Sequence, residues 1–259
     1  MITAGIDVGC KTVKALILKD SEILASGVVL SDGFERNASI RKLWEAVLHK
    51  AALRATEVEQ VIATGTGKYD VPFANDHIVE IVADVKAALW LFPTARSVID
   101  VGAEQTRAAV FDANGKVLDY VLNEKCGAGL GAFFEAMARA LEMSLEEMGA
   151  LSFGAESASQ INAQCAAFAM LDVVSLIHNN SSKGDIARSI NHAIATKMSA
   201  TINEITVVPS VVFIGGCAKN NSIASFLSKR LGVDFQIPKE PVLAGALGSA
   251  LVAAANIAS

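Results

Sequence analysis

The fold is decided by two short stretches, Gly5-Ile6-Asp7-Val8-Gly9 and Val98-Ile99-Asp100-Val101-Gly102. Each is an apolar run that ends in Asp-Val-Gly and leads through a polar turn into a second apolar run. One copy describes an ordinary β-hairpin, because Asp-Gly turns are common between paired strands. Two copies in one chain of 259 residues predict a duplicated domain with two loops that offer glycine amides to an anion.

The apolar pattern around these stretches repeats as well. Its first round predicts strands at 2–9, 12–19, 23–30 and 58–64, with helices at 34–55 and 79–92. Its second round predicts strands at 97–101, 106–112, 117–123, 209–215 and 233–237. Helices are expected in that half at 131–141, 144–152, 165–178, 183–204, 223–231 and 242–258, and Ser144 with Glu147 resembles a capping box. We therefore expect an α/β protein of two similar lobes around a cleft.

The composition excludes several classes of function. Lys and Arg number 22 against 27 Asp and Glu, a net charge of −5. Because a nucleic-acid site needs clustered positive charge, we expect no nucleic-acid partner. Residues 242–258 are uncharged but fall short of the roughly 20 apolar residues of a membrane span, and the chain opens without a signal-peptide pattern. We expect a buried final helix, no membrane partner and a cytoplasmic protein.

The first loop, residues 7–12, has the chemistry of a phosphate site. Gly9 at the end of the strand lets backbone N–H groups approach phosphate oxygens. We expect Asp7 to orient water on a Mg²⁺ ion, and Cys10, Lys11 and Thr12 to lie against the nucleotide. A plain hairpin turn is the alternative for this loop alone, and the presence of a second copy favours the phosphate site.

The second loop carries Asp100 and Gly102 in the same positions, followed by Ala103, Glu104 and Gln105. We expect Asp100 to be the second catalytic carboxylate, and Gly102 and Ala103 to contact the nucleotide. Either Glu104 or Gln105 positions the attacking water, and the sequence leaves both open.

A third element is a pair of glycines between an apolar strand and a helix. Gly215 and Gly216 would let a flat ligand such as a purine lie against the backbone, and Lys219 follows in the same segment. The alternative is a plain strand-to-helix turn. Further on, Gly245 and Gly248 suit the close packing of the last helix.

Taken in order, these pieces resemble the actin, hexokinase and Hsp70 superfamily of ATPases. Phosphate loop, connecting segment at 63–67, second phosphate loop, adenosine loop and closing helix follow one another over essentially the whole chain. The resemblance implies two duplicated ribonuclease-H-like lobes around a nucleotide cleft, residues 1–95 and 96–259. It also implies that the final helix packs back toward a hinge near residues 93–96.

Two of the four cysteines, Cys126 and Cys165, stand where predicted helices begin. A helix N-terminus stabilises a thiolate, and equally an anionic cluster whose sulfurs accept hydrogen bonds. Two thiolates cannot complete a four-iron cluster, but two chains that meet on an axis supply four. The alternative is a pair of buried, inert cysteines, which is also how we interpret Cys217.

Both cysteine segments resemble the cluster-binding turns of 2-hydroxyacyl-CoA dehydratase activators and of the benzoyl-CoA reductase ATPase subunits. This resemblance implies a 4Fe-4S cluster that bridges two subunits, with Cys126 and Cys165 as metal ligands. It implies ATP and Mg²⁺ as further cofactors, and hydrolysis that pushes one electron at low potential into an acyl-CoA dehydratase or reductase. The two subunits would form a homodimer or a heterodimer with a paralogous ATPase subunit.

The chain departs from the activator pattern at two places. Activators usually have Gly-Gln-Asp where this chain has Ala103-Glu104-Gln105, and Phe-Ala-Glu-Ser-Glu where it reads Phe168-Ala169-Met170-Leu171-Asp172. These changes resemble the more divergent ATPase subunit of benzoyl-CoA reductase. The change at Ala103–Gln105 keeps open a regulatory or scaffolding homologue that does not hydrolyse ATP. A small-molecule kinase on the same fold is the other rival, although the chain lacks an obvious insertion to build a substrate pocket.

Overall fold

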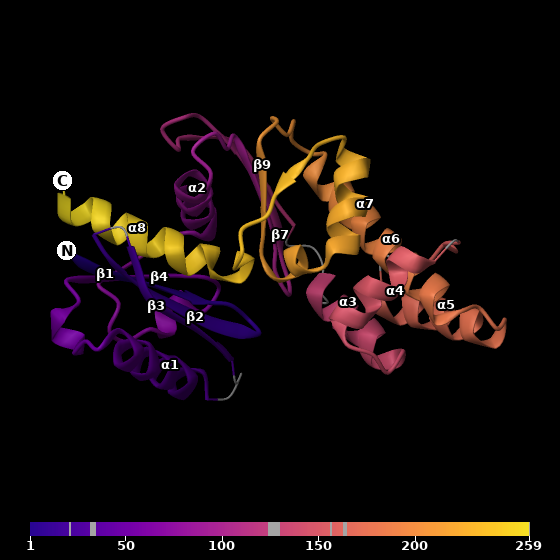
Figure 1. Cartoon of the computed structure of the whole chain (residues 1–259), viewed down its shortest axis with the longest axis horizontal. Coiled ribbons are helices and arrows are strands. Elements are labelled where there is room, and N and C mark those ends of the chain that lie inside the picture. The colour runs from indigo at the N-terminus through magenta and orange to yellow at the C-terminus, as the bar shows by residue number, and fades with distance from the viewer. Residues whose placement is uncertain (21, 32–34, 124–129, 156, 163–164, 259) are drawn as a thin grey trace. The chain divides into compact units, whose positions relative to one another are not determined.

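The computed structural model describes residues 1–20, 22–31, 35–123, 130–155, 157–162 and 165–258 (Figure 1). The chain divides into two compact units. The first contains Met1–Val98, Phe111–Leu118 and Pro238–Ser259, and the second contains Ile99–Val110 and Asp119–Ile237.

The first sheet has the strand order β3-β2-β1-β4-β5. Its strands are β1 (Ile2–Val8), β2 (Thr12–Lys19), β3 (Glu22–Leu30), β4 (Gln60–Thr64) and β5 (Asp76–His77). The first three strands form an antiparallel meander, and β4 and β5 continue from β1 in parallel. The central strands are buried over nearly their whole length, as expected for a sheet that is covered on both faces.

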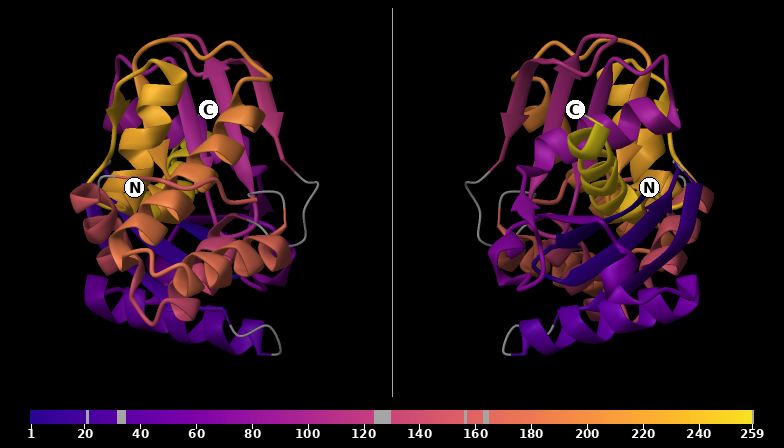
Figure 2. Two further views of the ribbon diagram at one scale, coloured as in Figure 1. Left: turned by 90° about the vertical axis from the view of Figure 1, so that its right-hand side faces the viewer. Right: turned by 90° about the vertical axis from the view of Figure 1, so that its left-hand side faces the viewer.

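Helices cover both faces of this sheet. The helix α1 (Arg36–Ala51) packs against β2 and β3 through Leu43, Trp44 and Val47, while α8 (Ala244–Ala258) lies on β1 and β4 with α2 (Glu80–Leu91) beside it. Figure 1 shows α1 and α8 on opposite sides of the strands, and both views of Figure 2 show α1 as a separate layer below them.

The last helix is a core helix of the first unit. A Cβ added to Gly5 would meet the backbone of α8, and one added to Gly248 would meet the backbone of Ala83 in α2. The Thr3 hydroxyl donates to the carbonyl of Ala250 at 3.0 Å in a buried position. By length and composition alone, Pro241–Ala258 is apolar enough to cross a membrane, but these contacts confirm the expected buried helix.

The second sheet repeats the order of the first, β10-β9-β6-β7-β8. Its strands are β6 (Ser97–Val101), β7 (Thr106–Phe111), β8 (Val117–Leu122), β9 (Val211–Ile214) and β10 (Phe235–Gln236). Counted along the chain, each half gives its first three strands to one side of the sheet and its last two strands to the other. Two sheets of the same order confirm the predicted duplication.

The helices of the second unit are α3 (Leu130–Ala140), α4 (Leu145–Gly154), α5 (Ala166–His178), α6 (Lys183–Ile202) and α7 (Asn221–Leu231). Three begin at capping side chains, which accept a backbone N–H: Ser144 from Glu147 at 3.1 Å, Ser182 from Asp185 at 3.0 Å, and Asn220 from Ile223 at 3.0 Å. Short 3₁₀ turns lie at Ala55–Glu57, Lys68–Asp70, Gly216–Lys219 and Pro241–Leu243.

The predicted elements agree with the structure to within a few residues, and the predicted capping box at Ser144 is present. The lobe boundaries 1–95 and 96–259 stay a prediction. The division into compact units is a different one, because it assigns the final helix and the hairpin at Phe111–Leu118 to the first unit.

Candidate functional site

The turn between β1 and β2 is closed by a hydrogen bond from the N–H of Gly9 to the carbonyl of Thr12, at 3.1 Å. Asp7 and Lys14 are direct partners across the two strands. The Lys14 ammonium lies 3.0 Å from the Asp7 carboxylate, with both side chains about 15 % exposed. Cys10 and Lys11 are half-buried at the tip. The predicted residues of the first loop are thus brought together in one turn.

A glycine in the segment after β4 lies close against the Asp7 carboxylate. Gly65 has a φ of +91°, and a Cβ there would lie 2.6 Å from Asp7 Oδ1 and 2.5 Å from the carbonyl oxygen of Val8. The N–H of Gly67 donates to that same carbonyl at 2.9 Å. Only glycine fits this approach of the connecting segment to the turn.

The start of α8 lies on the other side of Asp7. A Cβ on Gly245 would come within 3.1 Å of Asp7 Oδ2. The first turn of a helix carries partial positive charge, which favours a neighbouring carboxylate. Asp7 is therefore held by a lysine, a glycine loop and a helix start, all within the first unit.

The second turn repeats the first. The N–H of Gly102 donates to the carbonyl of Gln105 at 3.0 Å. Arg107 on β7 makes an ion pair with Asp100, and its Nη1 donates to Gln105 Oε1 at 2.9 Å. Ala103 is half-buried and Glu104 is exposed at the tip. The sequence predictions for Asp100, Gly102 and Gln105 fall in one cluster.

The glycine after β9 takes the place that Gly65 has in the first unit. Gly215 has a φ of +87°, and a Cβ there would meet the Asp100 carboxylate and lie 2.5 Å from the carbonyl oxygen of Val101. Gly216 and Lys219 follow in the exposed part of the 3₁₀ turn. Each unit thus presents one aspartate, one cation seven residues later, and one glycine with positive φ.

Cys165 is the N-cap residue of α5 and is partly exposed. The backbone N–H groups of Phe168 and Ala167, in the first turn of the helix, lower the pKa of its thiol, with a smaller contribution from Lys197. The helix start therefore favours a thiolate, as a metal ligand needs. Cys126 lies outside the described residues.

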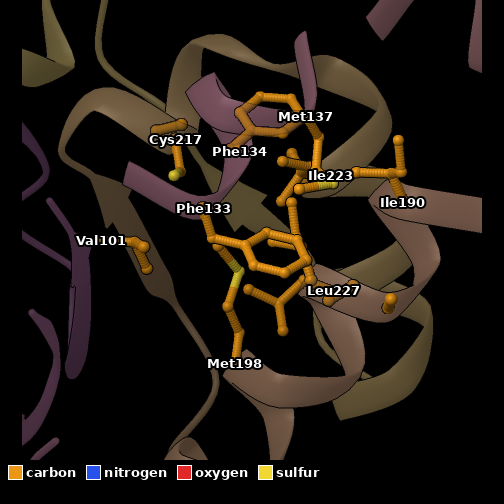
Figure 3. Packing of buried hydrophobic residues seen from close by; sticks show 14 of the residues in the cluster. Val101, Phe133, Phe134, Met137, Ile190, Met198, Cys217, Ile223 and Leu227 are labelled. Atoms are coloured by element: carbon orange, nitrogen blue, oxygen red, sulfur yellow. The ribbon is translucent and has the colours of Figure 1, made fainter. Parts of the chain in front are cut away.

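Cys217 has the opposite environment. Its side chain is packed in the apolar cluster of the second unit with Phe133, Phe134 and Met137 (Figure 3). Burial raises the pKa of its thiol to about 12, and the nearby carboxylates of Asp100 and Glu135 act in the same direction. This agrees with a packing role.

The described residues of one chain do not by themselves form a metal-binding group. Among the described residues of the chain, no three His, Cys, Asp or Glu side chains gather in a metal-binding group.

Sequence reasoning missed the two cations, Lys14 and Arg107. The signal that could have found them is the spacing, because each follows its aspartate by seven residues in both copies of the motif. It also treated Gly245 as a packing residue and did not connect it with Asp7.

Two sheets of one order with aspartate turns at matching places define the class of fold, that of the actin, hexokinase and Hsp70 superfamily. A ROK hexokinase from Thermus thermophilus shows the same fold at 14 % identity, with a TM-score of 0.52. The family model described as the BadF/BadG/BcrA/BcrD ATPase family matches residues 4–253. The chain belongs to this family.

Several relatives cover nearly the whole chain. The 2-hydroxyisocaproyl-CoA dehydratase activator of Clostridioides difficile is 30 % identical over 98 % of this chain and 95 % of its own length. The activator of lactoyl-CoA dehydratase of Anaerotignum propionicum is 33 % identical over 98 % of this chain and 97 % of its own. One of the subunits of benzoyl-CoA reductase from Thauera aromatica is 30 % identical over 96 % of this chain and 92 % of its own length.

Two solved structures are similar throughout. The Clostridium difficile 2-hydroxyisocaproyl-CoA dehydratase activator with bound ADPNP has a TM-score of 0.93 at 29 % identity, covering 99 % of this chain and 95 % of that one. The Acidaminococcus fermentans (R)-2-hydroxyglutaryl-CoA dehydratase component A has a TM-score of 0.94 at 28 % identity, covering both chains fully.

Proposed function

We propose that this ATPase drives low-potential electron transfer into an acyl-CoA dehydratase or a benzoyl-CoA-type reductase. The electron would pass through a 4Fe-4S cluster that bridges two subunits. The observation that carries the proposal is Cys165, the N-cap residue of α5, whose thiol pKa is lowered by the backbone N–H groups of Phe168 and Ala167. Hydrogen bonds to the sulfurs tune the reduction potential of an iron–sulfur cluster, and a helix start offers N–H donors for them.

The four thiolates of the cluster would be Cys126 and Cys165 from each of two chains. The described part of one chain offers no alternative set of ligands. Bound there, the cluster supplies one-electron chemistry. The second chain is either an identical copy or a paralogous ATPase subunit, and relatives of both kinds, activators and a component of a reductase, are similar to this chain.

The nucleotide would bind to the two aspartate turns. We propose that Gly9, Cys10, Lys11 and Thr12 hold phosphate oxygens, as do Gly102 and Ala103. Asp7 and Asp100 would orient water molecules on Mg²⁺, and Gly215 and Gly216 would lie against the base, with Lys219 nearby. Amides of turns and carboxylates on a hard cation are the groups that this chemistry needs. A cytoplasmic location accords with α8 being packed against β1.

Phosphate release and iron content together test the proposal. The protein is purified without oxygen, given Mg-ATP and no acceptor, and assayed for inorganic phosphate. Hydrolysis without an acceptor, together with about four irons for every two chains, supports it. Turnover only with an added small-molecule acceptor supports a kinase, and iron without turnover, even beside the partner, supports a regulatory homologue.

A matched pair of variants examines the ligands. Cys165→Ser removes a proposed ligand and should abolish iron binding. Cys10→Ser changes a cysteine in the nucleotide loop of the first unit and should retain the iron. Equal iron in both variants would contradict the assignment of Cys165.

A further inference from the structure

The two turns share a backbone and differ in charge at the tip. Both are closed by the same hydrogen bond, from Gly9 to Thr12 and from Gly102 to Gln105. At the matching tip position, the first turn carries Lys11 and the second carries Glu104. A cation suits a phosphate oxygen, whereas a carboxylate is repelled by it and suits a water molecule or a metal. The two turns therefore have different tasks.

Arg107 settles the orientation of Gln105. Its guanidinium carries only N–H donors, so the Gln105 atom that faces it at 2.9 Å is the carbonyl oxygen. The same guanidinium holds Asp100, and both charged side chains are less than 15 % exposed. The amide NH₂ group of Gln105 is thereby left to donate elsewhere. A group fixed in this way offers hydrogen-bond donors, and its acceptor atom is already engaged.

Glu104 is the other polar side chain of the turn. It is exposed, and among the described residues no hydrogen bond or ion pair engages its carboxylate. Residues 102–105 contain no second acidic residue. The other carboxylate of the turn, Asp100, is already paired with Arg107, so Glu104 is the better placed proton acceptor.

We propose that Glu104 is the general base of ATP hydrolysis and that Arg107 is a positioning residue, which fixes Gln105 as a donor to the transferring phosphoryl group. The inference rests on the proposed ATPase function and divides the labour between two residues that the sequence left open. The water oxygen forms a bond to the γ-phosphorus, and one water proton passes to the Glu104 carboxylate. The bond from the γ-phosphorus to the β–γ bridging oxygen breaks, and its electron pair leaves with ADP.

The main test is phosphate release in a single turnover by the cluster-loaded protein. Glu104→Gln should slow release by about 100-fold or more, the usual contribution of a general base, while Mg-ATP binding stays at the wild-type level. Glu45→Gln, at an exposed position of α1, is the matched control and should behave as wild type. A Glu104→Gln variant of wild-type rate would overturn the inference.

Exchanging residues 104 and 105 tests whether the acid must stand at position 104 or need only be present in the turn. Glu104→Gln/Gln105→Glu keeps one acid and one amide in the turn but places the acid against Arg107. The swapped variant should stay as slow as Glu104→Gln, because an arginine-bound carboxylate faces away from the water. Recovery of the wild-type rate would refute the assignment.

Arg107 is tested through its effect on Gln105. Arg107→Lys keeps the charge beside Asp100 but lacks the fork that bridges two groups. It should lower kcat by about 10- to 100-fold, in keeping with the cost of misplacing a catalytic group, with KM unchanged. In the Gln105→Ala variant, adding Arg107→Lys should lower kcat only a little further. Losses that multiply in the double variant would show that Arg107 does not act through Gln105.

The wild type distinguishes this inference from the proposed function. If the wild-type protein hydrolyses ATP and Glu104→Gln does so equally well, only the inference fails. If the loaded wild-type protein, alone and with its partner, releases no phosphate, the proposed function fails and the inference falls with it.

Discussion

Gly215→Ala should destabilise the second unit strongly. The residue has a φ of +87°, and its new Cβ would meet the Asp100 carboxylate and the Val101 carbonyl oxygen, 2.5 Å away. The left-handed backbone costs an L-residue about 1–2 kcal/mol, and forcing a methyl group into filled space costs about 1–3 kcal/mol. The expected loss in the free energy of unfolding is about 2–5 kcal/mol.

Two other glycines separate these contributions. A Cβ on Gly232 meets nothing within 4 Å, but its φ is +66°, so Gly232→Ala should cost only the backbone strain of about 1–2 kcal/mol. A Cβ on Gly216 also meets nothing within 4 Å, and its φ is not left-handed. Gly216→Ala should therefore leave stability nearly unchanged.

Urea unfolding of the three variants gives the answer. The urea concentration at the midpoint should be highest for Gly216→Ala, lower for Gly232→Ala and lowest for Gly215→Ala. The dependence of the free energy of unfolding on urea should be the same in all three. The approach of Gly215 to Asp100 also predicts that Gly215→Ala weakens Mg-nucleotide binding, measured by calorimetry. If Gly215→Ala is as stable as Gly216→Ala, the close approach of the glycine to the aspartate turn is wrong.

Three further results are expected. In metal-free protein, Cys165 should be alkylated at a lower pH than an ordinary thiol, because its pKa is lowered. The buried Cys217, with a pKa of about 12, should stay unmodified. Peptide mass spectrometry measures both, and equal labelling of the two cysteines would contradict this. Gly248→Ala puts a Cβ into the backbone of α2 and should prevent stable folding. Gly154→Ala, in open space at the end of α4, should instead stabilise the protein by up to about 1 kcal/mol, measured by thermal unfolding. A stable Gly248→Ala variant would show that α8 and α2 are not so close. Ser144→Ala removes the N-cap of α4 and should cost about 1 kcal/mol in urea, and no loss would mean that the cap does not form.

The sequence allowed the aspartate turns to be predicted because their pattern is local. A strand that ends in Asp-Val-Gly needs no distant partner to form its turn, and the repeat made the duplication visible. The same holds for the capping box at Ser144, because both of its partners lie within four consecutive residues. These features depend on backbone conformation over a few residues.

The contacts that complete the site were not predictable in that way. Lys14 lies in a strand, where a cation most often faces solvent, and only the register of β1 with β2 places it opposite Asp7. The two-residue strand β5, Asp76–His77, is too short to show a period. The place of α8 beside Asp7 depends on packing between the two ends of the chain, which no local pattern encodes.

The most direct test of the central claim is electron paramagnetic resonance of the anaerobically purified, dithionite-reduced protein, with and without Mg-ATP. We expect the signal of a reduced 4Fe-4S cluster, about one for every two chains, that changes when Mg-ATP is added. A protein that is silent and free of iron after the same preparation, alone and co-expressed with a paralogous subunit, would contradict it.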